Sequence, residues 1–207
     1  MDSLRGDSVV PRLVRLYAGL ALYGFSEALM VVAVLGLAPW DVLHQGLAEH
    51  TAISIGGWSI IVGAVVLLLW IPLRQRPGLG TVSNVVCIGL AIDASLMLLE
   101  EPSGLALRIG YLLAGIGLNA VATALYIGAR LGPGPRDGLM TGLARRGHSI
   151  RVVRTGIEAT VLVVGFLLGG TVGIGTVLYA VGIGPLVHLL LPRLVVRGRP
   201  AAEPIGA

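Results

Sequence analysis

Long apolar stretches, separated by short polar or glycine-rich connections, fill almost the whole chain. One helix needs about 20 apolar residues to cross the hydrocarbon core of a bilayer, and six segments approach that length. They are residues 13–35, 57–73, 80–99, 107–129, 152–169 and 173–192. With 55% hydrophobic residues, 13% charged residues and a mean hydropathy of +0.89, a soluble domain could not cover this apolar surface. The pattern therefore predicts an all-α integral membrane protein with six transmembrane helices, in contact with the lipid bilayer.

The chain contains one sequence unit twice. When residues 12–48 are compared with the residues 96 positions later, 16 of the 37 pairs are identical, and residues 54–93 match those 95 positions later. The two units predict two membrane domains, residues 13–99 and 107–192, between short tails at 1–12 and 193–207. Because each unit holds three spans, an odd number, the second unit enters the membrane from the opposite side. We therefore expect an inverted repeat, an architecture found in many secondary transporters.

The distribution of arginine predicts the orientation in the membrane. All 15 basic residues are arginines, and most lie in the N-terminal segment, in the connections after the second and fourth spans, and in the C-terminal tail. The connections after the first and fifth spans contain none. This alternation follows the positive-inside rule, so we expect a multi-pass protein of the bacterial inner (plasma) membrane with both termini in the cytoplasm. Topology thus accounts for the excess of arginine, and no nucleic-acid partner is expected.

A matching motif follows the first span of each unit. It reads PWDVLHQGL at residues 39–47 and PRDGLMTGL at residues 135–143. Proline is favoured at the first position of a helix, and an aspartate in the first turn stabilises the exposed N–H groups there. The motif predicts a short amphipathic helix. Such a helix either lies flat at the membrane interface or re-enters the membrane as a half-helix that points into a central cavity.

These segments, together with GLALYGFSEALMV (19–31), WIPLRQRPGLGT (70–81) and IRVVRTGIE (150–158), resemble the YczE/YitT-type family of bacterial integral membrane proteins. The resemblance is closer to the YczE branch and runs from about residue 12 to residue 192. Ala38 departs from the family pattern, which favours the glycine that the second unit has at Gly134. The family is largely uncharacterised, so the resemblance implies an architecture and no substrate.

Ionisable residues inside apolar spans need a reason, because a charge near the bilayer centre costs at least about 2.5 kcal/mol. Glu27 lies near the middle of the first span and is either a proton-linked carboxylate or a structural one held by a neighbouring helix. Asp93 and His188 occupy matching positions of the third and sixth spans, where they either flank a pathway or lie hydrated near the interfaces. Arg154 and Glu158 have the spacing of an ion pair within one helix.

The sequence contains no signature of a metal, nucleotide or covalent-catalysis site, so we expect neither an enzyme nor a cofactor. The preferred interpretation is a secondary permease for a small solute, with its site between the two repeats. The alternative is a non-transporting accessory protein that scaffolds or assembles another membrane complex, and a homo-oligomer is compatible with both. The candidates for contact with a solute or a coupling ion are Glu27, Trp40, Asp41, His44, Asp93, Asn119, Arg136, Asp137, Arg154, Glu158 and His188. Of these, Asn119 is expected first of all to form hydrogen bonds between helices.

Overall fold

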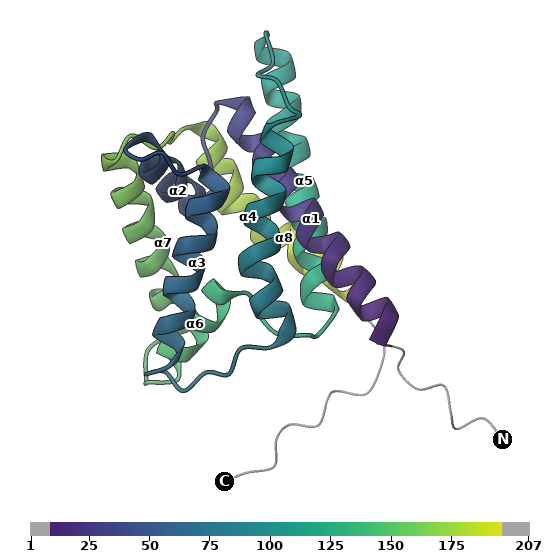
Figure 1. Cartoon of the computed structure of the whole chain (residues 1–207), viewed down its shortest axis with the longest axis vertical. Helices are drawn as coiled ribbons and strands as arrows, with labels where there is room; N and C mark the ends of the chain where they lie inside the picture. The colour runs from purple at the N-terminus through teal and green to yellow at the C-terminus, as the bar shows by residue number, and fades with distance from the viewer. Residues whose placement is uncertain (1–8, 196–207) are drawn as a thin grey trace, which may run out of the picture.

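The computed structural model describes residues 9–195, which form eight α-helices and no strand (Figure 1). In chain order they are α1 (Val9–Ala33), α2 (Pro39–Glu49), α3 (Ile55–Trp70), α4 (Leu79–Leu96), α5 (Leu105–Gly128), α6 (Pro135–Ala144), α7 (Ile150–Leu167) and α8 (Ile174–Leu194). The all-helical prediction is confirmed for this part of the chain. The tails expected at 1–12 and 193–207 lie mostly outside the described residues, and α1 already begins at Val9.

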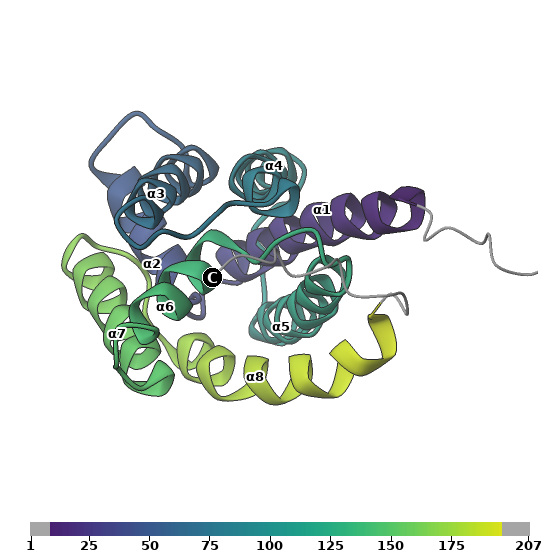
Figure 2. The same ribbon diagram turned by 90° about the horizontal axis from the view of Figure 1, so that it is seen from below.

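Two long helices, α1 and α5, form the centre of the molecule and pack against each other along most of their length. Glycines allow this close approach. A Cβ atom on Gly19 would lie 2.9 Å from the backbone nitrogen of Tyr126, and one on Gly115 would lie 2.7 Å from the Cγ of Met30. The first part of α1 thus meets the last part of α5, so the two helices run in opposite directions. Helix α4 packs on α1, and α8 packs on α5, as Figure 2 shows from below.

The two short helices, α2 and α6, lie within the helical bundle. Helix α2 packs on α7 and α3, and α6 packs on α3 and α7. A glycine permits each main contact: Gly165 of α7 lies against the backbone of Val42 and Leu43, and Gly138 of α6 lies against the ring of Trp70. Most residues in the first two turns of α2 are buried. Both short helices are thus packed against other helices of the protein, and whether they lie at the membrane interface or re-enter the membrane stays a prediction.

Four of the described helices, α1, α4, α5 and α8, are long and apolar enough to cross a membrane. Helix α3 is apolar but has 16 residues. Helix α7 has 18 residues, and its first half carries the charged side chains Arg151, Arg154 and Glu158. Large apolar side chains such as Leu90 and Val181 are more than half exposed on the outward surfaces of the long helices. A surface of this kind is typical of helices that face lipid.

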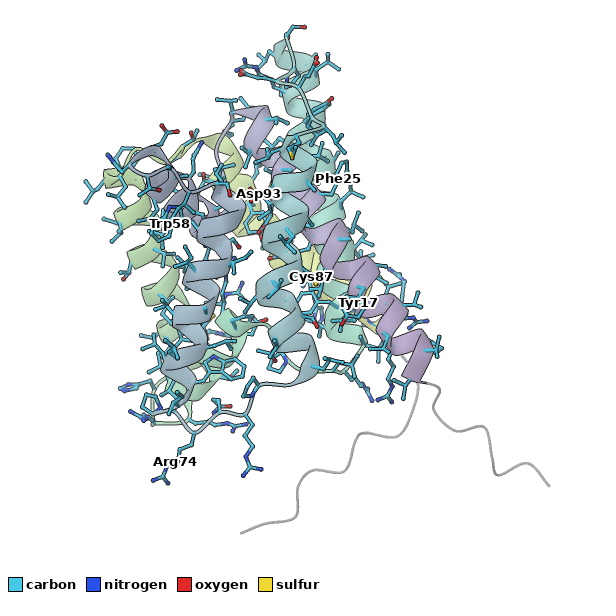
Figure 3. The ribbon with its side chains drawn as sticks, in the orientation of Figure 1. Tyr17, Phe25, Trp58, Arg74, Cys87 and Asp93 are labelled. Carbon is cyan, nitrogen blue, oxygen red and sulfur yellow. The ribbon has the colours of Figure 1, made fainter. Side chains whose placement is uncertain are left out.

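The two ends of the bundle carry different charges. The start of α1 and the end of α8 meet at one end, where Arg15 Nη1 donates to the Leu194 carbonyl at 2.9 Å. Arg74 lies at this end, and Asp93 lies toward the other (Figure 3). We call the first the basic end. The second, where α5 begins and Glu101 pairs with Arg108, we call the acidic end.

Candidate functional site

The first turns of α2 and α6 converge near the middle of the molecule. Each helix begins with a proline after an extended residue, which is Ala38 for α2 and Gly134 for α6. Ala38 stands where the family pattern favours glycine, but its φ of −62° suits alanine as well. Gly36 and Gly132, at the preceding turns, have φ values of +109° and +127°, which glycine adopts without strain. These turns lead the chain from the end of a long helix back into the bundle, so the positive end of each short helix's dipole points inward.

A cavity of about 360 Å³ lies where the two short helices meet. This volume is within the range of pockets that bind small molecules, roughly 300–1,000 Å³. The polar and charged side chains of its wall include Tyr23, Trp40, Asn84, Tyr126, Arg136, Asp137, Arg154, Glu158, Tyr179 and His188. The lining reaches toward the basic end through the first half of α7 and the last turns of α8. Since Arg154 lines the cavity and is 55% exposed, the cavity meets the surroundings there.

Trp40 and Arg136 join the two short helices at the cavity wall. The Arg136 guanidinium carbon lies 4.8 Å from the centroid of the Trp40 ring, which is a cation–π contact. The two residues occupy matching positions of the sequence repeat. Trp40 is buried and Arg136 is half-buried. The guanidinium also interacts electrostatically with Glu27 and Asp41. Arg136 therefore faces the cavity and also influences these two carboxyl groups behind the cavity wall.

The other charged residues of the wall have close neighbours. The Tyr126 hydroxyl donates to Asp137 Oδ2 at 3.1 Å, and its ring meets the Tyr23 ring edge to face, with centroids 6.1 Å apart. Arg154 Nε donates to Glu158 Oε1 at 2.9 Å, so the ion pair expected from the sequence is present. Because Arg154 is more than half exposed, such a pair contributes only about 0.3–0.5 kcal/mol to stability.

Glu27, Asp41 and His44 form a buried group of ionisable side chains, which we call the buried triad. Their exposed fractions are 1%, 2% and 0%. His44 Nδ1 lies 3.4 Å from Asp41 Oδ1, one turn along α2, and no side-chain oxygen or nitrogen of the triad has a hydrogen-bond partner among the described residues. Burial lowers the pKa of His44, and the nearby Asp41 carboxylate only partly opposes this shift. His44 is therefore neutral at neutral pH, because its usual pKa is already about 6.5.

Asn119 connects three helices. Its Nδ2 donates to Ser26 Oγ of α1 at 3.0 Å, and its Oδ1 accepts from the Tyr179 hydroxyl of α8 at 3.0 Å. The Ser26 hydroxyl donates to the Tyr23 carbonyl at 2.6 Å. Asn119 therefore forms the interhelical hydrogen bonds that its position predicted, and it holds Tyr179 at the cavity wall.

Asp93 lies outside this arrangement. Its carboxylate accepts hydrogen bonds from the Ser54 hydroxyl at 2.6 Å and from the Gly56 N–H at 2.9 Å, so it joins α4 to the start of α3. His188, at the matching position of the second unit, lines the cavity instead. Asp93 and His188 therefore do not line one cavity in this structure, because Asp93 is held by the first turn of α3.

Sequence reasoning missed three tyrosines of the cavity wall, Tyr23, Tyr126 and Tyr179. For two of them the repeat contained a signal, since Tyr23 matches Asn119 and Tyr179 matches Asn84. Polar side chains thus recur at the same positions of both units, although the residue types differ. A comparison by identity alone does not register such positions.

The wall contains groups of the kind that can bind and orient a polar molecule, namely two arginines, phenolic hydroxyls and a histidine. Within the described residues, no group of three or more His, Cys, Asp or Glu side chains is placed to hold a metal ion.

Comparison with known proteins matches residues 10–192 to a family described as a family of unknown function (DUF6198). The chain is 45% identical over 173 residues to an uncharacterized protein of Haemophilus influenzae, covering 83% of this chain and 79% of that protein. It is 33% identical over 192 residues to the uncharacterized membrane protein YczE of Bacillus subtilis, covering 91% of this chain and 89% of YczE. It is also 28% identical over 181 residues to the uncharacterized protein YyaS of that organism, covering 84% and 89%. No solved structure matches the chain. The resemblance to YczE is confirmed, and with the apolar helices it supports a membrane protein.

Proposed function

The chain belongs to the DUF6198 family, and we propose that it is a secondary permease that binds a small polar solute in the cavity between its two halves. The observation that carries this proposal is the cavity of about 360 Å³, whose polar wall is built from both halves around two converging short helices. An accessory protein that only scaffolds a partner has no need of such a cavity. In this proposal six helices cross the plasma membrane as two inverted repeats, with the basic end in the cytoplasm.

The two additional spans in this proposal are α3 and α7. At 1.5 Å per residue their 16 and 18 residues reach about 24 Å and 27 Å, slightly less than a hydrocarbon core of about 30 Å. A bilayer adapts to a short span by local thinning at a modest cost. The charged residues of α7 all lie in its first half, toward the basic end, so the rest of the helix is free of charge. Each of these helices also packs on both short helices, which supports a membrane position for all four.

Two hydrogen bonds at matching positions support the inverted repeat. The Leu35 carbonyl accepts from the Gly175 N–H, and the Leu131 carbonyl accepts from the Gly80 N–H, both at 2.8 Å. The first bond joins the turn after α1 to the start of α8, and the second joins the turn after α5 to the start of α4. A twofold relation between the halves exchanges these two bonds. Because α1 and α5 run in opposite directions, the bonds lie toward opposite ends of the bundle.

One difference between the halves supports a transport cycle. Helices α3 and α4 are packed together, with Gly56 against Gly89 and with Asp93 bonded to Ser54 and Gly56. Their counterparts α7 and α8 are not packed in this way among the described residues, and the cavity meets the surroundings beside Arg154. In our proposal transport exchanges the two arrangements. Helix α7 closes on α8 while α3 parts from α4, so that the cavity opens first to the basic end and then to the acidic end.

Labelling of single cysteines tests the topology. In a Cys87→Ala background, Ala48→Cys is expected to react with an impermeant thiol reagent on intact cells. Ala144→Cys, at the matching position of the second repeat, is expected to react only after permeabilisation. Equal labelling of the two sites at equal expression contradicts the inverted arrangement.

Two cysteine pairs test the exchange of conformations. In the same background, Ser54→Cys with Asp93→Cys joins positions that are in contact in this structure, and an oxidant is expected to cross-link it readily. Ser149→Cys with His188→Cys occupies the matching positions and is expected to cross-link in the alternate state. A solute found by thermal-shift screening of small polar metabolites should change the ratio of the two cross-links. If the first pair forms and the second never does, the exchange is wrong.

A further inference from the structure

The buried triad has no role in forming the cavity wall. Its side chains are at most 2% exposed, and none of their oxygen or nitrogen atoms has a hydrogen-bond partner among the described residues. An unpaired carboxylate away from water is costly, and a buried carboxyl group avoids that cost by holding a proton. The three groups face one another away from water, and a carboxyl group can donate a hydrogen bond to its neighbour only when it holds a proton, which points to a ligand of their own.

The lack of space around the triad and the chemistry of its three side chains limit which ligand can bind there. Its enclosure leaves no space for a solute, and each of its three groups can gain or lose a proton. Glu27 of α1 is electrostatically coupled to Asp41 of α2, and His44 Nδ1 lies 3.4 Å from Asp41 Oδ1. Two neighbouring carboxyl groups do not readily ionise together, because each negative charge opposes the other, and one proton held between them removes that repulsion.

One cation balances this group. Arg136 of α6 interacts electrostatically with both Glu27 and Asp41. The other titratable groups coupled to the triad from the neighbouring helices are Tyr23 of α1 and Tyr179 of α8. With Arg136 charged, one carboxylate ionised and the other protonated, the whole group is neutral. When a second proton enters, the charge of Arg136 is left without its partner.

We infer that Glu27, Asp41 and His44 form a proton-binding site whose occupancy is linked, through Arg136, to the contents of the cavity. A proton from water binds a carboxylate oxygen and leaves when that oxygen ionises again, and no other bond is made or broken. Arg136 also lines the cavity and lies over Trp40, so its charge acts on the triad and on a bound solute at once. Proton uptake therefore frees Arg136 to bind a negatively charged group in the cavity. The proton site rests on the triad alone, and its coupling to transport rests on the proposed permease function.

Infrared spectroscopy of the purified full-length protein in lipid vesicles measures the site without any solute. A protonated carboxyl group has a C=O stretching band that an ionised one lacks. We expect this band at pH 7, where exposed carboxyl groups are ionised because their pKa values lie near about 4. Glu27→Gln and Asp41→Asn should each remove it. Glu100→Gln, the same type of change at an exposed residue, should leave it unchanged.

Arg136→Gln tests the link to the cavity. Loss of the cation should raise the proton affinity of the triad about tenfold, which moves the midpoint of the band up by about one pH unit. Arg136→Lys keeps the charge and should restore the midpoint, and thermal unfolding shows whether each variant is folded. Absence of the band in the folded wild type at pH 7, or its persistence in both carboxyl variants, overturns the proton site. An unchanged midpoint in folded Arg136→Gln overturns the link. Because no solute is present, these outcomes are independent of whether the protein transports.

Discussion

Asn119 tests how the helices around the cavity are held together. It is fully buried in α5 and forms two interhelical hydrogen bonds of 3.0 Å, to Ser26 of α1 and to Tyr179 of α8. In membrane proteins such bonds contribute about 0.6 kcal/mol on average and at most about 1.7 kcal/mol each. Asn119→Leu removes both bonds while keeping a side chain of similar volume. We therefore expect the free energy of unfolding to fall by about 1–3 kcal/mol.

Unfolding in mixed micelles with a rising fraction of denaturing detergent, followed by circular dichroism, measures this loss. Asn84→Leu is the matched control, because Asn84 also lines the cavity but has no hydrogen bond within the described part of the chain. It should cost less than about 0.5 kcal/mol, the usual range for a site without a specific interaction. Tyr179→Phe added to Asn119→Leu should cost little more, since the shared bond is already gone. Equal losses for Asn119→Leu and Asn84→Leu would refute the reasoning.

Two further predictions concern the short helices. Gly138→Ala places a methyl group against the Trp70 ring and should lower the free energy of unfolding by about 1–3 kcal/mol in the same assay. Gly110→Ala is the control, because Gly110 has open space around it, and it should cause no loss. Equal effects of the two changes contradict the packing of Gly138 on Trp70. Burial lowers the pKa of His44 in the folded protein. Below about pH 6.5 the unfolded chain therefore binds more protons than the folded protein does. The free energy of unfolding thus decreases as the pH falls through that value. His44→Gln should therefore flatten the stability–pH profile between about pH 6.5 and 5, and an unchanged slope would count against the burial of a neutral imidazole.

The short helices show which part of the fold can be predicted from local sequence. Proline, the following aspartate and the helical spacing predict where each one starts, and α2 and α6 do begin at Pro39 and Pro135. Whether they lie flat or within the bundle depends on their contacts with α3 and α7. Those contacts involve residues far away in the chain, such as Gly165 against Val42. The local pattern therefore predicts where each short helix starts, but not which helices it packs against.

The candidate site shows the same division. Because a charge in lipid is costly, the sequence indicates a structural or functional role for both Glu27 and Asp93. Glu27 lies in the buried triad, whereas Asp93 accepts hydrogen bonds from Ser54 and Gly56, which lie 39 and 37 positions earlier in the chain. A buried carboxylate needs a proton or a partner. The local sequence does not distinguish the two cases, because the partner comes from another helix.

The packing of the short helices also shows why sequence identity underestimates the relation between the two halves. Gly165 of α7 lies against Val42 of α2, and in the matching contact Trp70 of α3 lies against Gly138 of α6. In the repeat, Val42 matches Gly138 and Gly165 matches Trp70, so both positions count as mismatches. In three dimensions each contact joins a glycine to a larger residue, with the two roles exchanged between the halves. Changing one member of either pair alone creates an overlap or a void. The two positions are therefore constrained jointly, and this constraint exists only in the contact between helices.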